Sequence, residues 1–498
     1  MERKLGIISV FDKRGIVEFC ESISSHFTFV STGNTAKLLE SSKIDVTTVS
    51  SLTEFPEILG GRVKTLHPKI MGGILGTLAH KKELEELGIT PFGLVVVNLY
   101  PFEEVTAQSH DLTHALENID IGGVTLLRAA AKNYQEVIVV SSPDDYSAVS
   151  TAITNGDVTQ ELRKNLAKKA FSRTASYDIA IHSWFSEGMD FPERYLSSYS
   201  TPQDLRYGEN LHQEAKYYLE YGKLPFYTQI HGKNISYNNL VDFSAAISIL
   251  SEHDAPSCAV IKHTSPCGFA SAPTIETAFD HAFATDNLSA FGSVMGFNQP
   301  ITEPLAEKLH AMFVDAIIAP EYEREALAIL SKKSKLILCR FNEFTMPKQS
   351  IKLVPNGVLV QSADLHIIDR SDTQVVSKRQ PTSQEFEDLL FAWKVVKHTK
   401  SNAAVISKGT RTLGIGMGQT SRIGAVELAL RRAGSRARGS VMASDAFFPY
   451  RDSIDTAVKE GISAIIAPGG SIRDNESILA ADEAGIAFVW SKLRAFLH

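Results

Sequence analysis

The sequence predicts an α/β protein with a parallel-sheet domain at the N-terminus and two smaller, related α/β units after it. Three observations carry this prediction. In the first 190 residues, apolar runs of strand length alternate with segments of helical periodicity, which is typical of a parallel sheet covered by helices. A polar stretch over residues 188–204, with Pro192 and Pro202 and no periodicity, then interrupts the pattern. Beyond it, three motifs recur in the same order.

The elements of the first 190 residues are predicted from the lengths of apolar runs and from helical spacing. In chain order they are a strand at 5–10, a helix carrying Ile16, Val17, Cys20 and Ile23, strands at 29–30 and 94–99, a helix from about 124 to 133, a strand at 137–140 and a long helix at 158–185.

The recurring motifs predict an internal duplication in the second part of the chain. They are Ile261-Lys-His-Thr264 with Val396-Lys-His-Thr399, Ser289-Ala-Phe-Gly292 with Ser444-Asp-Ala-Phe447, and Ala-Ile-Ile-Ala-Pro ending at Pro320 and again at Pro468. The alternative is that short sequences typical of buried strands recur by chance. The Lys-His-Thr match argues against this alternative, because that sequence is not typical of a buried strand. We therefore expect three parts, with boundaries at 1–190, 200–365 and 366–498.

Composition excludes several classes of protein. The chain has 498 residues, 44% of them hydrophobic and 21% charged, and a net charge of −7, which argues against a nucleic-acid coat or a polybasic membrane surface. Its four cysteines are scattered, as in a reduced cytosolic protein, and no apolar run reaches the length of a membrane span. With no signal-peptide pattern at the N-terminus, we expect a cytoplasmic protein without nucleic-acid or membrane partners.

Candidate ligand-binding residues follow the strands of the first domain. Ser9 and Lys13 leave the first strand, and Ser31, Gly33 and Thr35 follow the next one. Ligands of an open parallel sheet bind beyond the carboxyl ends of its strands, and hydroxyls, glycine and helix N–H groups there form an anion cradle. These turns predict a phosphate site, with simple helix capping as the alternative.

Further candidates come from three later segments of the same domain. Residues 61–68 carry Lys64 and Thr65 in a loop with three potential cations and no acid. Tyr100 ends a buried strand, and Asp120 opens a helix that has Lys132 toward its far end. A cyclising dehydration needs an anion grip, an oxyanion partner and proton shuttles, which Lys64, Tyr100, Asp120 and Lys132 can supply.

The second part carries a sharper signal at Lys262 and His263. A buried strand delivers this adjacent pair, and a rigid turn is predicted over residues 264–268. A desolvated lysine and a histidine suit deprotonation of a weak amine and stabilisation of an oxyanion. Upstream, residues 206–210 and 236–239 are rich in side chains for planar, multidentate hydrogen bonding, as a purine-like ligand requires, or as ordinary turns do.

Two motif matches fail or stay ambiguous. Residues 266–270 resemble the Pro-Cys-x-x-Cys motif of zinc deaminases, but Ala270 replaces the second cysteine and no His-x-Glu precedes it, so we expect no catalytic metal. The glycine-rich segment 414–422 has Gln419 where a dinucleotide fingerprint needs glycine. An anion or pteridine contact and a plain strand-to-helix turn both remain open for it.

Six stretches of the sequence are distinctive when taken together: Arg62-Val-Lys-Thr-Leu-His-Pro68, Asn98-Leu-Tyr-Pro-Phe102, residues 119–133, Lys262-His-Thr264, Ser444-Asp-Ala-Phe-Phe-Pro449 and Arg494-Ala-Phe-Leu-His498. By these stretches, and in order over essentially its whole length, the sequence resembles the bifunctional AICAR transformylase/IMP cyclohydrolase family. The resemblance implies the last two steps of IMP synthesis: formyl transfer from 10-formyltetrahydrofolate to AICAR (5-aminoimidazole-4-carboxamide ribonucleotide), then dehydrative ring closure.

The resemblance also implies where each activity resides. A methylglyoxal-synthase-like cyclohydrolase domain occupies 1–190, and two cytidine-deaminase-like units without zinc, 200–365 and 366–498, form the transformylase. It implies 10-formyltetrahydrofolate as cosubstrate, no catalytic metal, room for a structural monovalent cation, and a homodimer that shares its transformylase sites.

Site residues are carried over by their motifs. For formyl transfer, Lys262 and His263 match the catalytic pair, and Asn402 is counted with them. The transformylase nucleotide positions are Arg206, Tyr207, Asn238, Asp315 and Arg494, and the folate positions are Arg422, Phe447 and Asp452. In the cyclohydrolase, Ser9, Lys13, Ser31, Gly33, Thr35, Lys64 and Thr65 match the nucleotide pocket, and Tyr100, Asp120 and Lys132 match the ring-closure group, with Lys64 also counted as catalytic.

Three positions depart from the family pattern. Phe11 stands where serine is usual, Asn34 replaces a second glycine, and Leu211 replaces a proline. Asn34 tolerates positive φ better than most residues, so its loop can survive, whereas Phe11 removes a phosphate-binding hydroxyl. The two alternative functions are those of a zinc nucleobase deaminase and of a non-catalytic effector-binding protein. The missing zinc ligands argue against the first and the intact lysine and histidine sets against the second.

Overall fold

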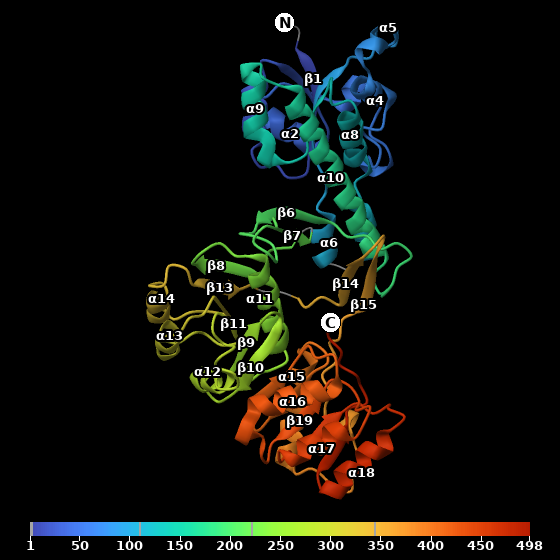
Figure 1. Cartoon of the computed structure of the whole chain (residues 1–498). Coiled ribbons are helices and arrows are strands. Elements are labelled where there is room, and N and C mark those ends of the chain that lie inside the picture. The colour runs from blue at the N-terminus through green and yellow to red at the C-terminus, as the bar shows by residue number, and fades with distance from the viewer. Residues whose placement is uncertain (1–2, 109–110, 221–222, 343–344) are drawn as a thin grey trace. The chain divides into compact units, whose positions relative to one another are not determined.

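The computed structural model describes residues 3–108, 111–220, 223–342 and 345–498. Its backbone forms two compact units, and the division between them falls after Ser200, inside the polar stretch 188–204 (Figure 1). Each unit has its own sheets and its own hydrophobic core, so each is described by itself.

The first unit is built on a five-stranded sheet in the order β3-β2-β1-β4-β5, with every neighbouring pair parallel. Its strands are β1 (Lys4–Val10), β2 (Phe27–Ser31), β3 (Val46–Thr48), β4 (Phe92–Asn98) and β5 (Ile138–Val140). Its helices are α1 (Ile16–Ile23), α2 (Gly33–Ser41), α3 (Val49–Thr53), α4 (Pro68–Leu75), α5 (Lys81–Glu86), α6 (Phe102–Gln108), α7 (Leu112–Glu117), α8 (Ile121–Lys132), α9 (Tyr146–Asn155) and α10 (Gln160–Phe185).

The predicted parallel sheet of this unit is confirmed. Strand β4 is buried along its whole length, which explains why it reads as an unbroken apolar run rather than an alternating one. Helix α8 starts earlier than its apolar periodicity indicated, because Asp120 caps it and Gly122 and Gly123 occupy its first turn. Strand β3 and the helices α3, α4, α5, α6, α7 and α9 were not predicted.

The second unit contains two six-stranded sheets with the same topology. The first has the order β10-β9-β11-β12-β13-β8 and the second the order β18-β17-β19-β20-β21-β16. Counted in this order, the third and fourth strand pairs of each sheet are parallel, and the first, second and fifth pairs are antiparallel. The duplicated α/β architecture predicted from the sequence is therefore confirmed.

The elements of the two halves correspond one to one. The first half comprises β8 (Tyr227–His231), α11 (Tyr237–Leu250), β9 (Ser257–Lys262), β10 (Ser265–Ser271), α12 (Ile275–Phe283), β11 (Val294–Phe297), α13 (Glu303–His310), β12 (Ala316–Ala319), α14 (Arg324–Leu330) and β13 (Ile337–Phe341). The second comprises β16 (Gln374–Val375), α15 (Ser383–Lys397), β17 (Ala404–Ser407), β18 (Thr412–Gly416), α16 (Arg422–Ala433), β19 (Val441–Ser444), α17 (Asp452–Lys459), β20 (Ala464–Ala467), α18 (Asp474–Ala484) and β21 (Ala487–Trp490).

Only one of the three repeated motifs occupies equivalent positions. The Ala-Ile-Ile-Ala stretches form β12 and β20, which correspond. The two Lys-His-Thr motifs do not, because Lys262 ends strand β9 whereas Lys397 ends helix α15. Ser289 precedes β11 whereas Ser444 lies at the end of β19. The duplication is real, but two of the matches that predicted it are coincidences.

Two local predictions in this unit were wrong. The rigid turn expected over 264–268 is largely strand β10, an edge strand of its sheet that tolerates Pro266 with a register irregularity beside it. The turn itself is the two residues His263 and Thr264, which connect β9 to β10. The polar stretch 188–204 also ends in a strand, β6 (Tyr199–Asp204), which pairs with β7 (Lys216–Glu220).

The two halves of the second unit share one core. Apolar residues of α11, α15 and both sheets form a single buried cluster, and the Ser271 N–H donates to the Thr410 carbonyl at 2.8 Å across the junction. A separate hairpin, β14 (Gln349–Val354) with β15 (Gly357–Ser362), belongs to neither six-stranded sheet. Among the helices of the described residues, none has the length and apolar character to cross a membrane.

Candidate active sites

The two predicted phosphate loops of the first unit meet at the carboxyl ends of β1 and β2. Lys13 Nζ donates to Thr35 Oγ1 at 2.8 Å and also to the Val10 carbonyl. Burial lowers the pKa of Lys13, although Asp12 beside it acts in the opposite direction. Ser31 is fully buried and its hydroxyl donates to the Ile8 carbonyl at 2.7 Å, so its donor is used inside the sheet.

The basic loop 61–67 comes to the same edge of the sheet. A Cβ built on Gly33, whose φ is +46°, would lie 3.7 Å from Lys64 Nζ, which places the ammonium beside the β2–α2 turn. Lys64 Nζ also lies 3.4 Å from Glu57 Oε2. Thr65 is buried, and its Oγ1 would lie 3.0 Å from a Cβ on Gly122 at the start of α8. Two lysines and a helix N-terminus thus converge there, an arrangement suited to an anion.

Asp120 and Tyr100 also come together. Asp120 caps α8 by accepting the Gly123 N–H at 2.6 Å, and it forms a backbone hydrogen bond with Tyr100. Burial raises the pKa of Asp120, and these two hydrogen bonds oppose that shift. Tyr177 of α10 fixes the segment that precedes α8: its Oη accepts the Asp120 N–H at 2.8 Å and donates to the Asn118 carbonyl at 3.1 Å. No sequence signal singled out Tyr177.

Lys132 is not part of this cluster. It is exposed at the other end of α8, and the 12 residues of that helix separate it from Asp120 by about 18 Å along the axis. Its assignment to ring closure stays a prediction, carried by the resemblance alone.

The loop that contains Phe11 is fixed by Asn98, at the end of β4. Asn98 Oδ1 accepts the N–H groups of Phe11 and Asp12 at 2.6 and 2.9 Å, and its Nδ2 donates to the Asp12 carbonyl at 2.9 Å. The Phe11 ring is 50% exposed and lies edge-on to Tyr100, with 5.6 Å between ring centroids. The loop is therefore held by its backbone, independently of a hydroxyl at position 11.

We expect Asp120→Asn to lower the rate of ring closure by at least about 100-fold, in the range found when a proton-transfer group is removed. Asparagine caps helices as well as aspartate does, so the melting temperature should stay unchanged. Because burial raises the pKa of Asp120, ring closure in the unaltered enzyme should fail on the acid side at a pH above the ordinary aspartate range. Asp111→Asn, at the cap of α7, is the matched control. Equal rates for the two variants would contradict the role.

In the second unit, Lys262 and His263 lie at the junction of β9 and β10. Lys262 Nζ donates to the Phe291 carbonyl at 2.9 Å, which uses one of its three protons. His263 is exposed, and both turn residues have positive φ, +52° for His263 and +65° for Thr264. The Thr264 N–H donates to Asp242 Oδ1 of α11 at 2.7 Å.

Further ionisable groups surround this turn. Asp315 accepts from Lys233 Nζ at 2.6 Å and from Asn239 Nδ2 at 2.8 Å. Burial raises the pKa of Asp242; the nearby charge of Asp315 acts in the same direction, and those of His263 and Lys400 oppose it. The resemblance predicted Asp315, and Asn239 lies in the segment 236–239 that the sequence singled out. Lys233, Asp242 and Lys400 were missed, because they come from segments that only the tertiary fold brings together.

Arg206, Tyr207 and Asn238 form a second group near the start of α11. The Arg206 guanidinium lies over the Tyr207 ring, 4.7 Å from its centroid, and donates to the Tyr207 hydroxyl at 3.0 Å. Arg206 Nε is buried and has no hydrogen-bond partner among the described residues. Asn238 Nδ2 donates to the Glu209 carbonyl at 3.1 Å. The segment is fixed to the helix because the Tyr237 N–H donates to the Tyr207 carbonyl at 3.1 Å.

Asn402 and Arg422 form a third group with Asp445. Arg422 is buried; its guanidinium pairs with Asp445, donates to Asn402 Oδ1 at 2.6 Å and reaches the Ala403 carbonyl at 3.0 Å. It is therefore placed to hold Asn402 and Asp445, and its predicted folate contact stays a prediction. Phe447, 37% exposed after β19, and Asp452, exposed at the start of α17, are the folate candidates on the surface.

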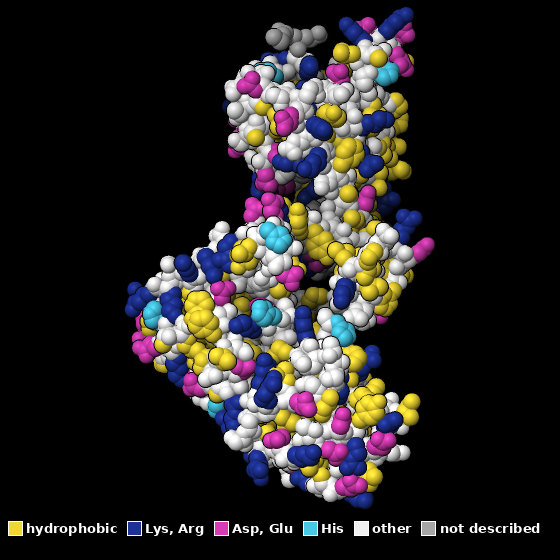
Figure 2. All heavy atoms as spheres, in the orientation of Figure 1, with side chains coloured by type: hydrophobic (Ala, Val, Ile, Leu, Met, Phe, Trp, Pro, Cys, Tyr) yellow, Lys and Arg dark blue, Asp and Glu magenta, His cyan; other side chains and the backbone are white. Residues whose placement is uncertain are grey.

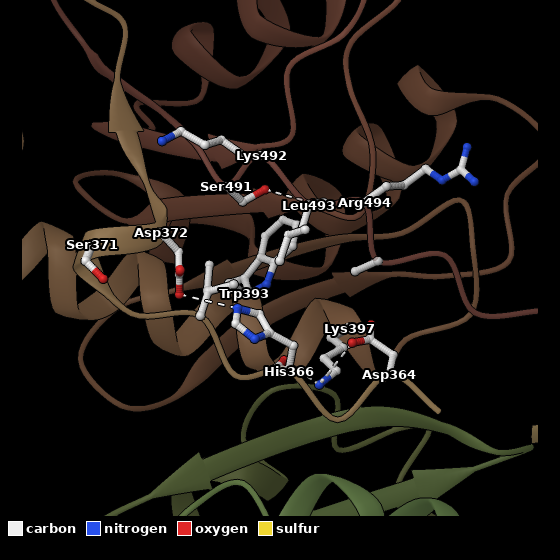
Figure 3. A pocket seen from close by; sticks show the side chains of 12 residues that line it. Asp364, His366, Ser371, Asp372, Trp393, Lys397, Ser491, Lys492, Leu493 and Arg494 are labelled. Atoms are coloured by element: carbon white, nitrogen blue, oxygen red, sulfur yellow. Dashed lines mark hydrogen bonds and ion pairs between the residues drawn. The ribbon is translucent and has the colours of Figure 1, made fainter. Parts of the chain in front are cut away.

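Arg494 borders a cavity of about 550 Å³ between α15, the segment 364–372 and the C-terminal segment (Figure 3). Trp393 and the His366–Asp372 pair, 3.4 Å apart, face this cavity, whereas Arg494 extends away from them. Within the described part of the chain, no hydrogen bond or ion pair joins the Lys262–His263 turn to Asn402, Arg422 or Arg494.

The glycine-rich segment 414–422 allows close packing between a strand and a helix. A Cβ on Gly414 would lie 2.2 Å from the Ala429 carbonyl oxygen, and one on Gly416 only 1.9 Å from that of Ala425, so these glycines let α16 approach β18. This favours the strand-to-helix turn over an anion loop for that segment. In the described residues, no group of three or more His, Cys, Asp or Glu side chains is placed to hold a metal ion.

Comparison with known proteins gives consistent results for both units. A family model described as AICARFT/IMPCHase bienzyme matches residues 130–432, and one described as MGS-like domain matches residues 15–125. Proteins named "Bifunctional purine biosynthesis protein PurH" are similar over their whole length. Those of Oceanobacillus iheyensis, a Thermoanaerobacter species and Acetivibrio thermocellus are 46%, 45% and 44% identical, each aligned over 99% of this chain and 100% of its own. This chain belongs to the AICARFT/IMPCHase bienzyme family.

Proposed function

We propose that this chain divides the two reactions of its family between separate sites, one on each compact unit. The chain is a bifunctional AICAR transformylase and IMP cyclohydrolase that performs the last two steps of IMP synthesis. We assign ring closure to residues 1–190 and formyl transfer to residues 200–365 and 366–498, with 10-formyltetrahydrofolate as the formyl donor. The observation that carries this division is that the two clusters of candidate residues lie on separate compact units.

In the cyclohydrolase site, Lys13, Lys64 and the hydroxyl-rich turn after β2 would bind the nucleotide phosphate. Lys13 is already held by Thr35, so little ordering is needed when an anion arrives. The carboxamide nitrogen of formyl-AICAR then attacks the formyl carbon, the ring closes, and water leaves. Asp120, with a pKa raised by burial, and Tyr100 beside it are suited to moving the protons of this step.

In the transformylase site, the amine of AICAR is a poor nucleophile because its lone pair is delocalised into the ring. His263 would take the amine proton as the nitrogen attacks the formyl carbon of 10-formyltetrahydrofolate. Lys262, with two ammonium protons free of the Phe291 carbonyl, would stabilise the oxyanion. Collapse of the intermediate breaks the bond between the formyl carbon and the folate nitrogen, which takes up the proton that His263 removed, leaving tetrahydrofolate and formyl-AICAR.

The experiment that tests this function mixes the purified protein with AICAR and 10-formyltetrahydrofolate and follows the products by chromatography. IMP formed together with tetrahydrofolate supports both activities on one chain, with Phe11 and Asn34 tolerated. Formyl-AICAR that accumulates without IMP would contradict ring closure on this chain and implicate those two positions. Binding without turnover would instead favour an effector-binding protein.

We further propose a cytoplasmic homodimer with shared transformylase sites, and the β14–β15 hairpin supports it. In this hairpin Ile351 pairs with Val360 and Leu353 with Val358, so one face is apolar, while Ser350 and Lys352 lie on the other. The apolar face is open: Leu353 is 81% exposed, and Figure 2 shows apolar side chains gathered over this region. A lone two-stranded hairpin is barely stable in water, so a covering partner is required. A face without charges can pack against its own copy.

We expect Leu353→Lys to convert the dimer to a monomer and to lower formyl transfer by at least about 100-fold, because a shared site loses the partner's groups. Ring closure should not change. Ser350→Lys adds the same charge to the other face of the hairpin and is the control. The measurements are light scattering and the two separate activity assays. A Leu353→Lys protein that stays dimeric would rule out the hairpin as the dimer contact.

A further inference from the structure

We propose that Asp242 is the positioning residue of the transformylase site: its carboxylate holds the His263–Thr264 turn in its left-handed conformation. This inference rests on the proposed role of Lys262 and His263 in formyl transfer. It concerns a residue of helix α11 that precedes the catalytic pair by about 20 positions in the sequence and that no motif identified.

The turn is strained in its backbone. Ser265 pairs with Lys262 across the β9–β10 hairpin, so His263 and Thr264 are the two central residues of a two-residue turn. Both have positive φ, as in a type I′ turn, where glycine and asparagine are the usual residues. The left-handed region is unfavourable for an ordinary residue, and it is least suited to a β-branched one such as Thr264. Something must hold this conformation.

Asp242 supplies the restraint. Its Oδ1 accepts the Thr264 N–H at 2.7 Å, a hydrogen bond to a charged acceptor, which is stronger than one between neutral groups. Thr264 adds a bond of its own, from Oγ1 to the His263 carbonyl at 2.6 Å. With Lys262 held by the Phe291 carbonyl on the other side, the two side chains of the pair leave the turn in fixed directions.

The test measures kcat and KM of formyl transfer, and the rate of ring closure, in full-length Asp242→Asn, Asp242→Ala and the control Asp280→Asn, an exposed aspartate of α12 paired with Lys308. Asp242→Asn keeps an oxygen for the Thr264 N–H, so we expect a loss in kcat below about tenfold. Asp242→Ala loses the restraint, and kcat should fall about 100-fold with KM nearly unchanged. Ring closure and the control should match the unaltered enzyme.

A second substitution separates positioning from general instability. Glycine adopts positive φ without strain, so Thr264→Gly in the Asp242→Ala background should recover part of the lost kcat. No recovery, or a loss of kcat in Asp242→Asn as large as that in Asp242→Ala, would overturn the proposal. Full activity of Asp242→Ala would overturn it as well. Failure of the underlying assignment looks different: His263→Ala would then retain formyl transfer.

Discussion

Replacing either Lys262 or His263 with alanine is expected to abolish formyl transfer while leaving ring closure of supplied formyl-AICAR unchanged. Loss of a proton-transfer group lowers rates by about 100- to 10,000-fold, and loss of an oxyanion donor by about 100- to 1,000-fold. Ring closure should be spared because the residues assigned to it lie on the other compact unit, which has its own sheet and core. The measurement is product analysis of each reaction supplied separately.

The environment of the pair makes large stability effects unexpected in these variants. His263 is exposed, and Lys262 has one hydrogen bond, to the Phe291 carbonyl. Substitutions at such positions usually change stability by about 0.5 kcal/mol or less, so the melting temperature should hardly move. A matched control is Lys308→Ala on α13, which removes an exposed lysine of the same unit. A folded Lys262 or His263 variant that loses both activities would contradict the two-site division.

The sequence could predict the sheets because their signals are local. Strand β4 and strand β12 are short buried runs, and α10 is a long periodic segment, so length and apolar spacing suffice to place them. The candidate residues at the strand ends followed from the same logic, since the carboxyl ends of parallel strands share one edge. Lys13 and Thr35 do meet there.

What could not be predicted depends on tertiary contacts. Asp242, Tyr177 and Asn98 each act through one to three hydrogen bonds to loops 22 to 87 positions away in the sequence, and no sequence spacing predicts such a contact. For the same reason, the repeated sequence motifs predicted structurally equivalent positions poorly. Lys262-His263 stands in an exposed turn, whereas Lys397-His398 ends a helix that is packed against both halves of the second unit. The same two residue types therefore serve different purposes.

The buried Lys397 forms an ion pair with Glu252, and removal of Lys397 is expected to cause the largest loss of stability. Its side chain is 6% exposed and that of Glu252, from the loop after α11, is 9% exposed, with 2.8 Å between Nζ and Oε1. Lys397 also donates to the His366 carbonyl at 2.9 Å, and His398 Nε2 lies 3.0 Å from the same Glu252 oxygen. Breaking one side of a buried pair typically costs about 3–5 kcal/mol, so Lys397→Ala should lower the unfolding midpoint of the second unit markedly.

A double substitution and the pH dependence of the unfolding free energy distinguish the Lys397–Glu252 ion pair from simple packing of the Lys397 side chain. Replacing both partners of the buried pair, as in Glu252→Gln with Lys397→Met, leaves neither of them as an unpaired buried charge, and Asp364, which also contacts Lys397, is exposed, so the double variant should destabilise less than Lys397→Ala alone. Burial alone would raise the pKa of Glu252, but its contacts with His398 and Lys397 outweigh this and lower it. A carboxyl with a depressed pKa stabilises the fold above its unfolded pKa, and that stability is lost as the pH falls through the folded value. The difference in unfolding free energy between the unaltered enzyme and the double variant should therefore shrink as the solution is acidified below about pH 4. A difference that does not change with pH would mean that Lys397 stabilises the junction by its aliphatic stem rather than by its charge.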